Sequence, residues 1–126
     1  MIREELRPLA VPIASLSPYP RNPRNGDIEA IRESLRKHGQ FKPVLVQAGT
    51  NYIIAGNHTY MAMLEENETM IAALPLHIDD EQAARINVVD NRTAQLGGMD
   101  DGALLALLED IGLEGTGYSE ADLQKL

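Results

Sequence analysis

The stretch IIAGNHTYMAML, residues 53–64, constrains the fold more than any other part of the chain. Apolar residues lead up to Gly56, and the polar residues Asn57, His58 and Thr59 lead back into an apolar run. This pattern predicts a buried strand that passes through the glycine into a helix starting near Asn57. Such a junction gathers unpaired backbone N–H groups and the positive end of the helix dipole, an arrangement that binds phosphate in unrelated folds. A plain turn with Asn57 as helix N-cap explains the same residues, so both interpretations stay open here.

Hydrophobic periodicity predicts that short strands and helices alternate along the rest of the chain. An edge strand is expected in LAVPIASLSPYP, followed by an extended loop, SPYPRNPRNGD. Further strands are predicted at 43–47, 52–55 and 70–78, the last being ambiguous with a helix. Helices are predicted at 28–38, 57–66, 81–96 and 102–111, with a capped helical turn near the end. Asp27, Asp79 or Asp80, and Asp100 stand where N-caps are expected.

Composition restricts the classes of protein that the chain can belong to. With 126 residues, of which 44% are hydrophobic, it matches one ordinary domain. The absence of cysteine excludes disulfides, thiolate catalysis and cysteine-bound metal. No apolar run is long enough for a membrane span or a signal peptide, so we expect a cytoplasmic protein with no membrane partner.

The charge is distributed unevenly. The chain carries a net charge of −8, yet residues 1–42 hold eight Lys or Arg against five Asp or Glu, a net of +3. Residues 43–126 hold three against fourteen, a net of −11. Nucleic-acid contacts are therefore expected in the early segment, at Arg21, Arg24, Arg32 and Arg36. The alternative is that Arg32 and Arg36 form only a solvated helix face.

Two further stretches carry residues suited to a nucleotide and its metal ion. HGQFKPVLV, residues 38–46, places three candidate ligand-binding residues between a helix and a strand: Gly39, Gln40 and Pro43. VVDNRTAQL, residues 88–96, sets Asp90, Asn91 and Arg92 on a helix. An acid beside an amide suits Mg²⁺, and an arginine can clamp phosphate through two hydrogen bonds. A helix C-cap and a surface charge network are the simpler explanations.

In this order and spacing, the three stretches resemble the boxes of the ParB N-terminal domain, in the fold shared by ParB and sulfiredoxin. The likeness starts at VPIASLSPYPRNPRN and covers about residues 8–112. AGNHTYMAM stands at the family's Gly-Glu-Arg-Arg box, and DNRTAQL is similar to its Glu-Asn-x-x-Arg box. The resemblance implies an α+β fold, a small mixed sheet with flanking helices, followed by C-terminal helices. The tail looks most like the ParB-like domains of phage proteins and of those ahead of DNA methyltransferases.

The departures from the family pattern narrow the expected chemistry. His58 and Thr59 replace the two arginines of the family box, which implies that a triphosphate is bound more weakly or in a different orientation than in the family. Sulfiredoxins carry a cysteine where this chain has Asn57, so sulfinic-acid repair is excluded. Small-molecule kinases of the same fold keep a Gly-x-His pattern, which leaves ATP-dependent phosphoryl transfer as an alternative.

The resemblance implies a ParB-like domain, residues 1–112, followed by a tail or the start of a missing segment at 113–126. It would bind a nucleoside triphosphate, CTP or ATP, or a nucleic-acid phosphate, and act in phage or mobile-element DNA metabolism, as an NTPase or nuclease. His58 and Asp90 are the candidate catalytic residues. Gly39, Gln40, Pro43, Gly56, Asn57, His58, Thr59 and Arg92 would contact the nucleotide. Asp90 and Asn91 would hold Mg²⁺.

The partners and the alternative role follow from the same resemblance. DNA is an expected partner, although no sequence-specific DNA-binding motif is present. ParB-like domains often pair through the region after the third box, and ALLALLEDI offers an apolar face for a homodimer. Packing of this helix on the domain's own core is the equally weighted alternative. The competing functional class is a non-catalytic module that targets a partner enzyme to DNA.

Overall fold

The computed structural model describes residues 1–21 and 27–126. The N-terminal part contains two short 3₁₀ helices and two short strands: η1 (Glu4–Leu9), β1 (Ala10–Pro12), η2 (Ile13–Ser15) and β2 (Ser17–Pro18). The central part runs α1 (Ile28–His38), β3 (Val44–Gln47), β4 (Tyr52–Ala55), α2 (Asn57–Glu65) and β5 (Met70–Leu76). The C-terminal part is helical, with α3 (Asp80–Leu96), α4 (Asp101–Ile111) and α5 (Glu120–Gln124).

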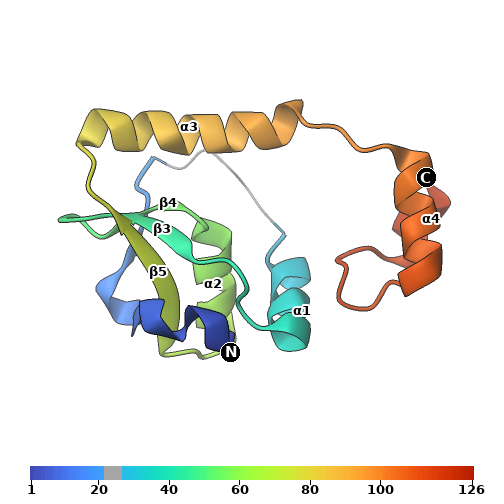
Figure 1. Cartoon of the computed structure of the whole chain (residues 1–126), viewed down its shortest axis with the longest axis horizontal. Coiled ribbons are helices and arrows are strands. Elements are labelled where there is room, and N and C mark those ends of the chain that lie inside the picture. Colours follow the sequence, from blue (N-terminus) through green and yellow to red (C-terminus); the bar gives the residue numbers. More distant parts are fainter. Residues whose placement is uncertain (22–26) are drawn as a thin grey trace.

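The strands form one mixed sheet in the order β1-β5-β3-β4-β2. β3 and β4 make an antiparallel hairpin, and α2 then carries the chain back so that β5 pairs parallel to β3. β1 lies antiparallel to β5 at one edge, and β2 lies parallel to β4 at the other. This arrangement confirms the predicted small mixed sheet with flanking helices (Figure 1).

Helices cover both faces of the sheet at β4. Ile53 and Ile54 are both fully buried, and successive strand residues point to opposite faces. Ile53 belongs to the core that includes Leu35 of α1 and Met63 of α2. On α3, the Asn87 side chain donates to the Ile54 carbonyl at 2.9 Å. The junction between β4 and α2 is therefore held from two sides.

Local sequence signals placed the helix starts well. The carboxylates of Asp27, Asp79 and Asp100 each accept a hydrogen bond from the backbone N–H three residues on. The ambiguous segment 70–78 forms the strand β5, since it pairs on both sides within the sheet. The 3₁₀ helix η1 was not predicted, because Pro8 lies inside it and its sequence lacks a clear period.

The helix α4 stands apart from the sheet (Figure 1). It follows α3 through residues 97–100, and Leu107 and Ile111 are more than half exposed, although Leu108 is buried. The alternative that ALLALLEDI packs on the main core is therefore not what the structure shows. Pairing with a second copy stays a prediction. None of the helices described here combines the length and hydrophobicity that crossing a membrane requires.

Candidate functional site

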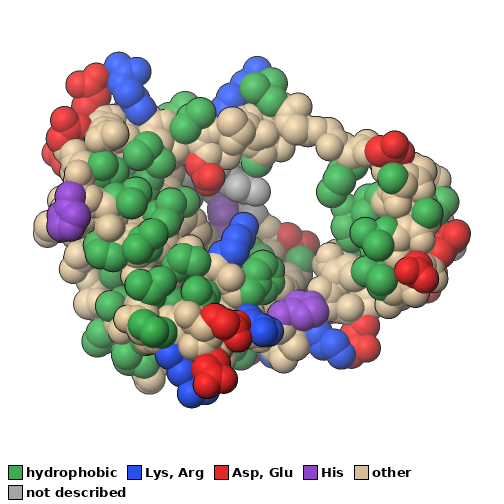
Figure 2. Space-filling model, viewed as in Figure 1, with side chains coloured by type: hydrophobic (Ala, Val, Ile, Leu, Met, Phe, Trp, Pro, Cys, Tyr) green, Lys and Arg blue, Asp and Glu red, His purple; other side chains and the backbone are tan. Residues whose placement is uncertain are grey.

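A cleft of about 1030 Å³ opens beside the junction of β4 and α2. Its walls come from α1, from residues 39–45, from the start of α2, from the middle of α3 and from residues 115–117. Figure 2 shows a hollow between the body and the C-terminal helices, with basic, acidic and histidine side chains around it. All three sequence boxes contribute residues to this cleft, as their resemblance to the family implied.

Gly56 shapes the floor of the cleft. It is the N-cap of α2 and has a φ of +100°, which is left-handed and favours glycine. A Cβ atom at this position would lie 2.6 Å from Cγ1 of Val44, a buried residue of β3. Glycine is thus required both by its backbone angle and by the close approach of α2 to β3.

Asn57 has a structural role that the sequence did not reveal. Gly56, not Asn57, is the N-cap, so the interpretation of Asn57 as a capping residue is wrong. Its buried side chain accepts a hydrogen bond from the Tyr19 N–H and donates one to the Ile53 carbonyl, both at 2.9 Å. The side chain fastens the chain after β2 to the start of α2. A ligand contact from Asn57 would come from its backbone.

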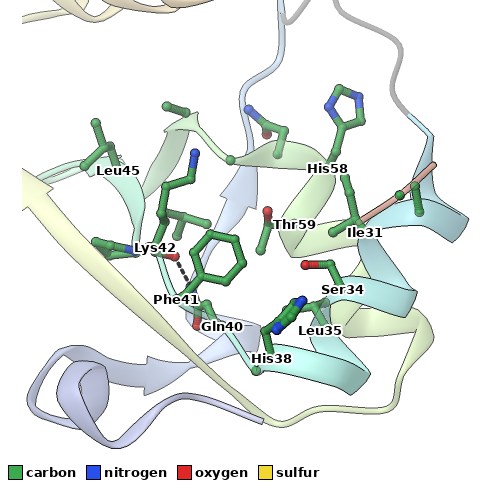
Figure 3. A pocket seen from close by; sticks show the side chains of 18 of the residues that line it. Ile31, Ser34, Leu35, His38, Gln40, Phe41, Lys42, Leu45, His58 and Thr59 are labelled. Atoms are coloured by element: carbon green, nitrogen blue, oxygen red, sulfur yellow. Dashed lines mark hydrogen bonds between the residues drawn. The ribbon is translucent and has the colours of Figure 1, made fainter. Parts of the chain in front are cut away.

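His58 and Thr59 occupy the first turn of α2, where backbone N–H groups have no carbonyl of their own helix to bond. In Figure 3, Thr59 and Ser34 point into a common space beside the Phe41 ring. The nitrogen-bearing ends of Lys42 and His58 extend towards the same side of that view. Backbone donors, hydroxyls and two nitrogen-bearing side chains therefore meet in one cleft, which is the chemistry that an anion needs.

In the first box, Gly39, Gln40 and Pro43 contribute shape rather than side-chain donors. Gln40 is fully buried: its amide oxygen accepts from the Ala72 N–H at 2.8 Å, and its amide nitrogen donates to the carbonyls of Ala72 and Lys42, each at 3.0 Å. These bonds tie the loop to β5. Gly39 ends α1 with a φ of +72°, and Pro43 lines the cleft beside it.

The residues of the third box face two different sides of the helix α3. Asp90 and Asn91 line the cleft, and the Asn91 side chain donates to the Asn87 carbonyl at 2.9 Å. Arg92 does not line the cleft; it lies with Arg85 and Val88 along a separate shallow hollow on α3. The structure therefore brings Asp90 and Asn91 to the predicted site and leaves Arg92 outside it.

Arg32 and Arg36, the predicted nucleic-acid contacts on α1, form a basic stripe that is largely paired with acids. Arg32 contacts Glu29 at 2.9 Å and Glu66 at 3.4 Å, and Arg36 contacts Glu66 at 3.2 Å. Partial burial lowers the pKa of Arg32, but the hydrogen bonds and charges of Glu29 and Glu66 raise it by more, so the pKa lies above its ordinary value. Arg21 is exposed in a turn, and Arg24 lies outside the described residues. The stripe therefore presents less free positive charge than its sequence suggests.

Lys42 is the site residue that the sequence reasoning did not select. It counted towards the early positive charge, yet it lines the cleft and makes no ion pair within residues 1–21 and 27–126. Among the described residues, Arg3 is the other lysine or arginine that lines the cleft, and it is paired with Glu5 at 2.8 Å. The position of Lys42 directly before Pro43 of the first box was the available signal.

This fold and these boxes define a ParB-type N-terminal domain. The family model for the ParB N-terminal domain matches residues 3–92, and the chain belongs to that family. It is 30% identical over 87 residues to the chromosome-partitioning protein Spo0J of Thermus thermophilus, covering 64% of this chain and 32% of that protein. It is 32% identical over 96 residues to the nucleoid occlusion protein of Geobacillus thermodenitrificans, covering 71% and 34%. The chain thus spans about a third of the length of these relatives.

Solved structures of ParB proteins share the fold. A C-terminally truncated ParB from Caulobacter crescentus, complexed with CTP-gamma-S, superposes with a TM-score of 0.70 at 22% identity, covering 90% of this chain and 73% of that one. The same protein complexed to the centromeric parS site gives 0.54 at 22% identity, covering 92% and 62%. A Pnob8-like ParB-N domain gives 0.58 at 22% identity, covering 81% and 43%.

Proposed function

We propose that the cleft binds a nucleoside triphosphate, with CTP as the first candidate. The observation that carries this proposal is the meeting of the α2 N-terminus, His58 and Lys42 in one cleft of an otherwise acidic protein. Helix N-termini and lysines both favour phosphate. The Caulobacter protein complexed with CTP-gamma-S supports CTP over ATP, and ATP remains the alternative to test.

A divalent cation would bind together with the nucleotide. Asp90 and Asn91 of the third box line the cleft and can offer oxygen ligands to Mg²⁺. Within the described part of the chain, no group of three or more His, Cys, Asp or Glu side chains could hold a metal ion. Most ligands would therefore come from phosphate oxygens and water, as is usual for Mg²⁺ at nucleotides. A two-metal nuclease needs several clustered metal ligands, so the residues that the structure describes in the cleft favour nucleotide binding.

The residues of the cleft would divide the work. The first-turn N–H groups of α2, with Gly56 allowing close approach, would bind phosphate oxygens, and Lys42 would balance their charge. His58 would donate to a phosphate or move a proton if the nucleotide is hydrolysed. If there is no turnover, the same cleft would serve a non-catalytic module.

DNA is the proposed macromolecular partner, in phage or mobile-element DNA metabolism. Support comes from membership of the ParB family, from the parS complex of the Caulobacter protein and from the resemblance of the tail to phage ParB-like proteins. Among the described arginines that were predicted to contact nucleic acid, Arg21 is exposed in a turn, whereas Arg32 and Arg36 are paired with Glu66. Binding should weaken steeply with salt, because such contacts release counterions.

A thermal-shift series with CTP, ATP, GTP and UTP, each with and without Mg²⁺, tests the nucleotide proposal. A ligand at a hundred times its Kd stabilises the protein by about 2.7 kcal/mol, a shift that is easily measured. Lys42→Ala should reduce the shift, whereas Lys125→Ala, an exposed lysine that does not line the cleft, should not. The proposal fails if no nucleotide shifts the wild-type protein, or if the two variants respond alike.

A further inference from the structure

The loop Glu114–Gly117 lies beyond the segment that the family model matches, which ends at residue 92, yet it reaches the cleft. Gly115, Thr116 and Gly117 line the same cleft as residues from the three sequence boxes. Figure 1 shows the C-terminal segment turning back towards α1 after α4. This loop is the part of the segment after α3 that lines the cleft.

Three contacts fix the loop to the last turns of α1. The Lys37 ammonium lies 2.8 Å from a Glu114 carboxylate oxygen, and the Gly115 N–H donates to Glu33 at 3.0 Å. His38 Nε2 lies 2.8 Å from the Gly115 carbonyl oxygen. Because a carbonyl oxygen only accepts, His38 must carry the hydrogen on Nε2.

The fit of the loop against α1 is close at one residue. Gly115 has a φ of +73°, and a Cβ atom there would lie 2.7 Å from both His38 Nε2 and Lys37 Cγ. The loop is also braced internally, since the Thr116 hydroxyl donates to the Leu113 carbonyl at 2.6 Å and accepts from the Tyr118 N–H at 3.2 Å. It therefore reaches α1 as a preformed turn, and a residue larger than glycine at position 115 would displace the side chains of His38 and Lys37.

We propose that the loop Glu114–Gly117 is a wall of the nucleotide cleft, and that its docking on α1 and nucleotide binding stabilise each other. This inference rests on the proposed function. The docked loop acts as a wall and not as a plug, because the cleft keeps about 1030 Å³ with the loop in place. Ligand sites are commonly about 300–1,000 Å³, so a nucleotide fits beside it. The domain boundary expected at residue 112 would then cut through the ligand site.

The coupling is reciprocal by thermodynamic linkage. If docking of the loop raises nucleotide affinity, then nucleotide must hold the loop docked by the same factor. Two independent measurements therefore report one quantity. These are the nucleotide affinity of a variant with a displaced loop, and the hydrogen-exchange protection of residues 113–118 with and without nucleotide.

Gly115→Ala displaces the loop, and Gly112→Ala is its matched control. Both glycines have left-handed φ angles, +73° and +83°, but a Cβ atom at Gly112 meets nothing within 4 Å. Both variants therefore place an L-residue at a left-handed φ, and only Gly115→Ala also disturbs the contact with α1. We expect Gly115→Ala to weaken nucleotide binding about 5- to 150-fold, the usual range of coupling between sites, and Gly112→Ala to bind like wild type.

A second pair of variants avoids the glycine strain. Glu33→Ala removes the acceptor of the Gly115 N–H without touching a residue that lines the cleft, and Glu29→Ala removes the same charge one turn earlier on α1. We expect weaker binding in Glu33→Ala alone. This pair decides the question if Gly115→Ala does not fold.

The outcomes separate this inference from the proposed function. Loss of affinity in the loop variants, together with slower exchange of residues 113–118 when nucleotide binds wild type, supports the inference. Wild-type affinity in both Gly115→Ala and Glu33→Ala overturns it and leaves the nucleotide site standing. Tighter binding in these variants also overturns it, because the loop would then oppose the ligand. If the wild-type protein binds no nucleotide, both the proposed nucleotide site and the inference about the loop are refuted.

Discussion

Replacing Gly56 by alanine tests the geometry on which the cleft depends. Two costs add at this position. An L-residue in the left-handed region costs about 1–2 kcal/mol. The new Cβ atom would also stand 2.6 Å from Val44 Cγ1, and overpacking of this kind costs about 1–3 kcal/mol. We therefore expect Gly56→Ala to lower the free energy of unfolding by about 2–5 kcal/mol.

Gly49→Ala is the control that separates the two costs. Gly49 has a φ of +98°, almost that of Gly56, but a Cβ atom there meets nothing within 4 Å. Only the backbone cost applies, so we expect about 1–2 kcal/mol. The difference between the two variants measures the contact of α2 with β3.

The double variant Gly56→Ala with Val44→Ala identifies the atom responsible. Val44→Ala by itself should destabilise the protein, since Val44 is only 1% exposed. In the Gly56→Ala background it should cost about 1–3 kcal/mol less, because the clashing methyl group is gone. Urea unfolding followed by circular dichroism gives all four free energies. Equal losses in Gly56→Ala and Gly49→Ala, or strictly additive losses in the double variant, would refute the assignment of the clash.

Three other changes test neighbouring features. Gln40→Ala should cost about 1–3 kcal/mol in urea unfolding, because it removes the acceptor of the buried Ala72 N–H and a donor to the Ala72 carbonyl; a loss below about 1 kcal/mol would contradict this role. Asn57→Asp should destabilise the protein more at pH 7 than at pH 4, since its side-chain donor to Ile53 becomes a charged acceptor; stability independent of pH would argue against the bond. Glu66→Gln should steepen the salt dependence of DNA binding, because it releases Arg36 and removes one of the two acids that contact Arg32; an unchanged slope would show that these arginines do not face DNA.

The sequence by itself determined the longer helices, the strands β3, β4 and β5, and the order of the boxes, but not the division of the expected N-terminal edge strand into β1, η2 and β2. The caps at Asp27, Asp79 and Asp100 were predictable because each carboxylate bonds an N–H only three residues on. The strand–glycine–helix junction was predictable because the change of hydrophobic period marks it. Family membership followed from the order of three short motifs, and the family model confirms it over residues 3–92.

Only the tertiary structure decided what individual side chains do. Asn57 looked like a cap, but its partner Tyr19 lies 38 residues away, and no local pattern reveals that bond. Arg92 follows Asp90 and Asn91 in the sequence, yet it lies on a different side of the helix α3 and does not line the cleft that they line. Gly115 meets His38 across 77 residues of chain. Such contacts depend on how helices pack against the sheet, and that packing is set by the whole core, not by the residues that it brings together.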